Sequence, residues 1–121
     1  MNRKENLKKK GCQFERKAGT FLEERGYQIL EYNFRCPYAE IDIIAKKGNV
    51  LIFCEVKYRK GTEMMSPLEA VHRRKMQRIS AAALFYIAKH PDADCQYRFD
   101  VIGMNDKEVI HIKNAFAFGG Q

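Results

Sequence analysis

The sequence is poor in the residues that mark metal-binding and disulfide-bonded domains. Its four cysteines form no Cys-x-x-Cys pair, and its three histidines have no metal-ligand spacing. This pattern argues against a zinc site. We expect His72, His90 and His111 to be surface or packing residues, and we expect the cysteines to be free thiols, with Cys54 a small buried hydrophobe of a strand.

The sequence also lacks long apolar segments. No stretch approaches 18 apolar residues, and the basic N-terminus is not followed by the apolar region of a signal peptide. Internal repeats, low-complexity segments and linkers are absent as well. We therefore expect a cytoplasmic protein that neither spans a membrane nor is exported, with residues 1–121 forming a single domain.

Basic residues outnumber acidic ones. The chain has 22 Lys and Arg against 15 Asp and Glu, a net charge of +7. Such an excess favours an anionic partner, most often nucleic acid. Residues 1–10 are a basic segment, either a solvated and frayed helix start or a mobile arm that contacts phosphate. The outward-facing arginines of the second predicted helix are either solvated or bind phosphate. The candidate nucleic-acid contacts are Lys8, Lys9, Lys10, Arg59, Arg73, Arg74 and Arg78.

Hydrophobic periodicity and turn residues predict an α/β domain with the order helix, three strands, helix, two strands. The first helix should end near Arg25, before Gly26. The second helix should open at Ser66-Pro67 and end near Lys89. The expected strands are Tyr27–Phe34, two strands within 39–60, Tyr97–Met104 and Glu108–Ile112.

The two central strands carry an unusual set of charged residues. Glu40 and Asp42 are two apart on the first strand, and Glu55 and Lys57 are two apart on the second. Side chains of a strand alternate between its faces, so each pair projects to one side.

The turn at Lys47-Gly48-Asn49 sets how these strands pair. A register symmetric about Lys47 and Gly48 gives three facing pairs: Lys46 with Asn49, Asp42 with Phe53, and Glu40 with Glu55. All four charged residues would then share one face. Asp42 would lie diagonal to Glu55, at ~7–8 Å, which is close enough for both carboxylates to reach one cation.

Three carboxylates at a half-buried strand end are costly unless they are paired or bind metal, so the pattern predicts a metal site. Two helical residues could take part. Lys75 falls in the middle of the apolar arc of the second helix, and it either snorkels outward or points toward the acidic residues. Glu15 lies at the rim of the first helix's apolar stripe, and it is either exposed or reaches this site.

Six segments together resemble a known family. They are GCQFERKAGTFLEERGYQILEYNFR, AEIDIIA, VLIFCEVKYR, AVHRRKMQRI, RFDVI and NAF. The chain resembles the YraN-like family of bacterial proteins and the PD-(D/E)xK nuclease core, with Holliday-junction resolvases as distant relatives. One position departs from the family pattern, because Ala39 stands where the family usually has glycine.

The resemblance implies a restriction-endonuclease-like fold: a central mixed sheet of about five strands flanked by two main helices. It also implies Asp42, Glu55 and Lys57 as the catalytic core, Glu15 as a helix acid and Lys75 as an auxiliary residue. Asp42 and Glu55, with Glu40, are hard oxygen ligands suited to Mg²⁺ or Mn²⁺. By analogy with resolvases, a homodimer is expected.

Three functions remain open at this point. The first is a metal-dependent endonuclease that hydrolyses DNA, with branched DNA as a candidate substrate. The second is a nucleic-acid-binding protein that keeps the fold but does not cut. The third is a protein-interaction domain in which the acids and lysine form a structural salt-bridge cluster.

Overall fold

The computed structural model describes residues 3–63, 72–91 and 95–117, with side chains from residue 13 onward. Within these residues the chain forms, in order, α1 (Arg3–Glu24), β1 (Gln28–Arg35), β2 (Glu40–Lys47), β3 (Val50–Tyr58), α2 (Arg73–Lys89), β4 (Gln96–Met104) and β5 (Val109–Phe116). The predicted order of elements is confirmed.

The element boundaries refine the prediction in three places. The helix α1 begins at Arg3, so the basic residues 3–10 are its first turns, and it ends two residues before Gly26, whose φ is 89°. The predicted start of the second helix at Ser66 lies outside the described residues, and the described part begins at Arg73. The strand β5 is longer than predicted and includes Phe116, which packs into the core.

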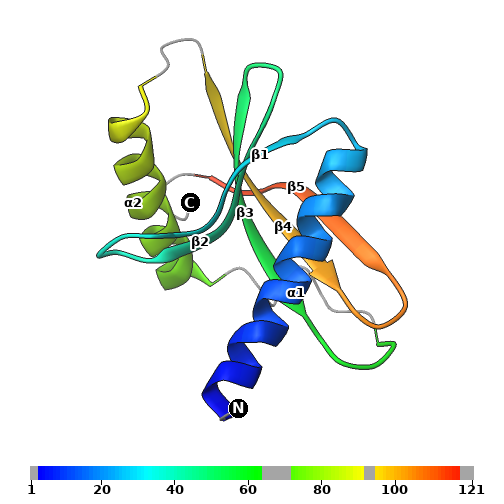
Figure 1. Ribbon diagram of the computed structural model, residues 1–121. Helices are drawn as coiled ribbons and strands as arrows, with labels where there is room; N and C mark the ends of the chain where they lie inside the picture. Colours follow the sequence, from blue (N-terminus) through cyan, green and yellow to red (C-terminus); the bar gives the residue numbers. More distant parts are fainter. Residues whose placement is uncertain (1–2, 64–71, 92–94, 118–121) are drawn as a thin grey trace.

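The five strands form one mixed sheet in the order β1-β2-β3-β4-β5. The pair β3 and β4 is parallel, and the other neighbours are antiparallel. The parallel pair follows from the connection through α2, because parallel neighbours need a long crossover while tight turns join antiparallel ones. The two helices lie on opposite sides of the sheet (Figure 1). The expected mixed sheet with two flanking helices is therefore confirmed.

Each helix covers its own hydrophobic core. On the α1 side, Ala18 and Leu22 pack with Ile52 and Cys54. On the α2 side, residues such as Ile79 pack with aromatic rings of β3 and β4. The strand β3 is thus buried on both faces, which explains its nearly continuous apolar run. Cys54 is 1% exposed, as expected of a small core residue.

The predicted register of the central hairpin is wrong by two residues. Lys47 pairs with Val50 and Ile44 with Phe53, so the turn is Gly48-Asn49. Gly48 has φ 60°, and a glycine with positive φ at the first central position is typical of two-residue hairpin turns. Asp42 therefore does not face Phe53, and Glu40 does not face Glu55.

The strict alternation of faces assumed for β2 also fails at Asp42. Ile41 packs into the α2-side core and Ile43 into the α1-side core, although residues two apart normally share a face. On the neighbouring strand Asn33 has a left-handed φ of 53°, close to the same point. The pairing of β2 with β3 ends at Ile43 and Cys54, while β3 continues along β4 as far as Tyr58.

The beginning of β2 therefore leaves β3 and turns toward α2. The ring of Phe34 lies 5.2 Å from that of Tyr86, and the ring of Tyr38 lies 6.2 Å from that of Phe85. These contacts fix the β1–β2 connection beside α2 (Figure 1). The fork between β2 and β3 opens at Asp42, and the predicted site residues lie around it.

Candidate functional site

Three carboxylates meet at the fork. One oxygen each from Glu15 of α1, Glu40 and Asp42 of β2 lie within 4.8 Å of one another. We call these three residues the acidic cluster. Glu40 is its outermost member, with a side chain that is 39% exposed and an oxygen 3.7 Å from Arg35 Nε. The oxygens converge from two elements on different layers of the fold, so the cluster depends on tertiary packing.

Asp42 is the innermost acid, held at the point where β2 leaves β3. Its Oδ2 accepts a hydrogen bond of 2.8 Å from the backbone N–H of Val56. This bond takes the place of a ladder bond that the diverging strands no longer make. Burial, together with the negative charge of Glu55, raises the pKa of Asp42 to about 7.

Glu15 leaves one oxygen without a partner. Its Oε2 is buried and makes no hydrogen bond. Burial, with the negative charges of Glu40 and Glu55, raises the pKa of Glu15, although hydrogen bonds with the side chains of Asn33 and Asp42 act in the opposite direction.

Glu55 and two lysines form the other half of the site. Lys75 Nζ lies 2.5 Å from Glu55 Oε1, and Lys57 Nζ lies 3.9 Å from the same oxygen. Of the two orientations expected for Lys75, outward into solvent or toward the acids, the structure shows the second. Burial and the nearby Lys75 ammonium lower the pKa of Lys57. Burial opposes protonation of Lys75 too, but its hydrogen bond to Glu55 raises its pKa.

The structure thus regroups the predicted metal ligands. Asp42 and Glu40 remain together, and Glu15 joins them from α1. Glu55 instead forms ion pairs with the two lysines. All five predicted catalytic residues lie around one fork, although the strand pairing that was expected to bring them together differs from the observed one.

The predicted nucleic-acid contacts fall on three parts of the chain. Arg73, Arg74 and Arg78 are exposed on α2, and Arg59 is exposed just after β3. Lys8, Lys9 and Lys10 belong to α1, but their side chains lie outside the described ones. Arg73 and Arg74 directly precede Lys75, the lysine that pairs with Glu55, and Arg78 follows it by three residues. The basic residues of α2 therefore border the site.

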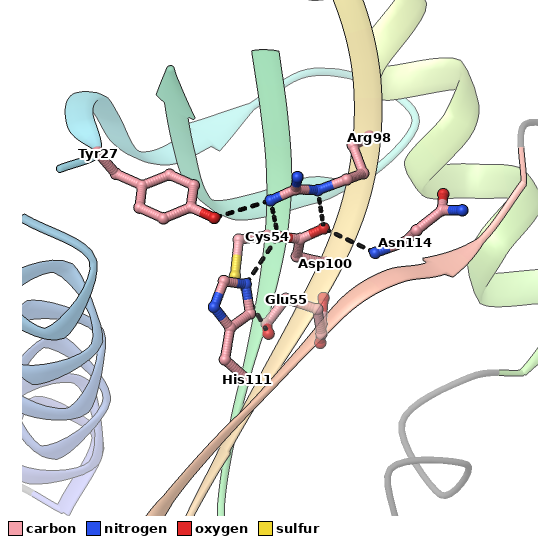
Figure 2. A network of polar contacts seen from close by, with 7 residues as sticks. All are labelled: Tyr27, Cys54, Glu55, Arg98, Asp100, His111 and Asn114. Atoms are coloured by element: carbon pink, nitrogen blue, oxygen red, sulfur yellow. Dashed lines mark hydrogen bonds and ion pairs between the residues drawn. The ribbon is translucent and has the colours of Figure 1, made fainter. Parts of the chain in front are cut away.

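Sequence analysis missed a buried polar network behind the site. Asp100 is fully buried on β4 and pairs in register with Cys54. Its carboxylate accepts hydrogen bonds from Arg98 Nε at 2.8 Å and from the backbone N–H of Asn114 at 3.0 Å, and it lies 2.7 Å from His111 Nε2 (Figure 2). A second Arg98 nitrogen donates to Tyr27 Oη.

His111 is a packing residue, as expected, with its ring edge-on to Phe21 and Tyr27. It also has a polar role that was not expected, because it binds Asp100. Burial opposes ionisation of Asp100, but the hydrogen bonds from His111 and Arg98 lower its pKa overall. The sequence does contain a signal for this network. Arg98 and Asp100 are two residues apart on a largely apolar strand, so both side chains lie on its α1 side.

Neither helix of the described chain combines the length and the hydropathy needed to cross a bilayer.

Comparison with known proteins identifies the family. Residues 14–104 match the model of the uncharacterised protein family UPF0102. A UPF0102 protein of Thermodesulfovibrio yellowstonii is 44% identical over 106 residues, covering 88% of this chain and 94% of the relative. One of Caldicellulosiruptor saccharolyticus is 42% identical over 117 residues, covering 92% and 99%. The chain therefore belongs to the UPF0102 family, the YraN-like family that its motifs predict.

Proposed function

We propose that the chain is a metal-dependent endonuclease of the PD-(D/E)xK superfamily that hydrolyses DNA phosphodiester bonds at branched structures. The observation that carries the proposal is the acidic cluster of Glu15, Glu40 and Asp42, with its unpartnered buried oxygen, beside a lysine pair. A salt-bridge cluster serving only stability would pair its buried acids with the nearby cations.

The donor set fits a hard divalent cation. Carboxylate oxygens are the ligands that Mg²⁺ and Mn²⁺ prefer. Among the described side chains, no Lys, Arg or His lies within ion-pair distance of Glu15 or Asp42. Burial raises the pKa of both groups, and repulsion by the negative charges of neighbouring carboxylates raises it further. A cation at the cluster would relieve this repulsion.

The residues then divide into two roles. Asp42, Glu15 and Glu40 would hold Mg²⁺ or Mn²⁺, and Glu55 borders them. When bound, such an ion polarises a phosphodiester and lowers the pKa of a bound water.

Lys57 is the residue best placed to act on the substrate. Its side chain is 41% exposed and only 3.9 Å from Glu55, so it can contact both the site and a phosphate oxygen. A positive charge there stabilises negative charge that develops on the phosphate. Lys75 fixes the position of the Glu55 carboxylate through its ion pair.

The test is cleavage of four-way-junction, flap and linear DNA with Mg²⁺ or Mn²⁺. We expect metal-dependent cleavage of a branched substrate, and we expect Lys57→Ala to slow it by about 100-fold or more. Lys47→Ala is the matched control, since Lys47 lies at the other end of β2 and should leave the rate unchanged. Wild-type rates in Lys57→Ala, or in EDTA, would contradict the proposal. Salt-sensitive DNA binding without metal binding or cleavage would favour the non-cutting binder instead.

A further inference from the structure

A groove adjoins the acidic cluster on the α2 side. It consists of two hollows of about 600 and 480 Å³ between the β1–β2 connection and the first turns of α2. Both hollows are lined by Tyr38, Arg74 and Arg78, and the second also by Glu40 and Lys75. Glu40 belongs to the acidic cluster and Lys75 pairs with Glu55, so the groove leads directly to the proposed site.

The charge of the groove suits an anionic chain. Arg74 and Arg78 are one helical turn apart on α2, so they project from the same side. Both are exposed, and within the described chain neither forms an ion pair with a carboxylate. With Lys75 they place three cations along the groove, and among the described residues that line it Glu40 is the one acid. Guanidinium groups without an internal partner are well suited to bind phosphate.

Tyr38 gives the groove an aromatic wall. Its side chain is 54% exposed, which is unusual for a large ring. The ring is held by an edge-on contact with Phe85, with centroids 6.2 Å apart and planes at 69°. Phe85 is itself covered by the Lys89 ammonium, 4.4 Å from its centroid. Tyr38 is thus fixed in place by α2 while much of the ring stays accessible.

We propose that this groove binds an unpaired nucleic-acid strand, with one base stacked on Tyr38 and the flanking phosphates held by Arg74 and Arg78. Exposed aromatic rings interleaved with cations are the usual means of binding single strands. The bases of a duplex are stacked on one another, and their faces are not free to meet a protein ring. The groove therefore selects substrates that carry an unpaired segment next to the bond that is cut. This inference rests on the proposed function for its choice of nucleic acid as ligand.

Binding of a fluorescein-labelled oligo-dT in EDTA tests the groove without any metal or cleavage. We expect Tyr38→Ala to weaken binding about fivefold or more and Tyr38→Phe to preserve it, since only the ring is needed for stacking. Arg74→Ala with Arg78→Ala should lower the slope of log K against log salt by about 1.4. The control, Lys107→Ala with Lys113→Ala, removes the same charge from exposed positions near β5, at the opposite edge of the sheet. It should leave the slope unchanged.

A spectroscopic variant reports the stack itself. The chain has no tryptophan, so Tyr38→Trp introduces a single indole at the groove. We expect its fluorescence to be quenched on addition of oligo-dT and to change little with a blunt duplex of equal charge. An oligo-rU arm tells whether the strand is DNA or RNA, and binding of either supports the inference.

The outcomes separate the groove from the metal site. Equal affinity of wild type and Tyr38→Ala for oligo-dT, or unquenched fluorescence on saturation, would overturn the inference even if metal binding is found. Loss of oligo-dT affinity in Tyr38→Ala, together with no metal binding to the acidic cluster, would leave the groove intact and remove the nuclease proposal.

Discussion

Replacing Asp42 with asparagine should leave the metal-free protein at least as stable as wild type at pH 8, yet remove its stabilisation by Mn²⁺. Asp42 is partly buried beside Glu55, and both burial and that negative charge disfavour its ionised form and raise its pKa to about 7. An amide oxygen at this position can still accept the Val56 N–H. The substitution thus removes repulsion and keeps the hydrogen bond. Thermal unfolding with and without Mn²⁺ measures both effects, and wild type should gain about 2.7 kcal/mol when Mn²⁺ is at 100 times its dissociation constant.

The pH dependence of the wild type supplies a check. Because the pKa of Asp42 is higher in the folded than in the unfolded chain, the folded state binds more protons between about pH 4 and pH 7. This group therefore makes the metal-free protein less stable as pH rises through that window. Asp42→Asn should reduce that loss. A destabilised Asp42→Asn protein at pH 8 would support the structural salt-bridge reading and contradict the metal site.

Asp100→Ala should cost about 3–5 kcal/mol of folding stability, since it leaves Arg98 with a half-buried charge and no carboxylate. Asp100 also accepts a hydrogen bond from the backbone N–H of Asn114, at the point where β5 carries extra residues opposite β4. Removing the carboxylate should therefore also weaken the pairing of β4 with β5. Denaturant unfolding measures the change. Glu24→Ala is the matched control, because Glu24 forms an ion pair with Arg25 at 3.9 Å but is 68% exposed. It should cost less than about 1 kcal/mol.

Acid should weaken the Asp100 network in a defined range. The pKa of Asp100 is lowered in the folded chain, so its contribution is complete above about pH 4, where an unfolded aspartate is ionised. That contribution is lost as the pH falls through the folded pKa. Wild type should therefore lose more stability below about pH 4 than Asp100→Asn. If the free energy of unfolding falls equally with pH in wild type and Asp100→Asn, the network does not stabilise the fold through the ionised Asp100.

The order and type of the elements could be predicted from the sequence because each rests on local signals. Apolar periodicity marked the helices, and the nearly continuous apolar run of β3 marked its burial on both faces. Gly26 stopped the first helix as expected, through its positive φ. The position of Lys75 within an apolar arc left two orientations open, and its ion pair with Glu55 decides for the one toward the acids.

The geometry of the site could not be predicted in the same way. The observed turn is centred on Gly48-Asn49, while the predicted turn was centred on Lys47-Gly48, and this changes the strand register by two residues. The sequence Lys47-Gly48-Asn49 is compatible with either turn. The break in alternation at Asp42 depends on Asn33 of the neighbouring strand, which adopts a left-handed conformation that asparagine tolerates. Glu15 meets Asp42 only because α1 packs over the fork. These are tertiary effects without a local signal.

The most direct test of the acidic cluster is a calorimetric titration of Mn²⁺ into wild type, Glu15→Gln and Glu24→Gln. Glu15 provides the unpartnered buried oxygen, while Glu24 is an exposed glutamate of the same helix. The account predicts saturable binding of Mn²⁺ to wild type and Glu24→Gln, with affinity reduced about tenfold or more in Glu15→Gln. Wild-type affinity in Glu15→Gln, or no saturable binding to any of the three proteins, would contradict a metal site at the fork.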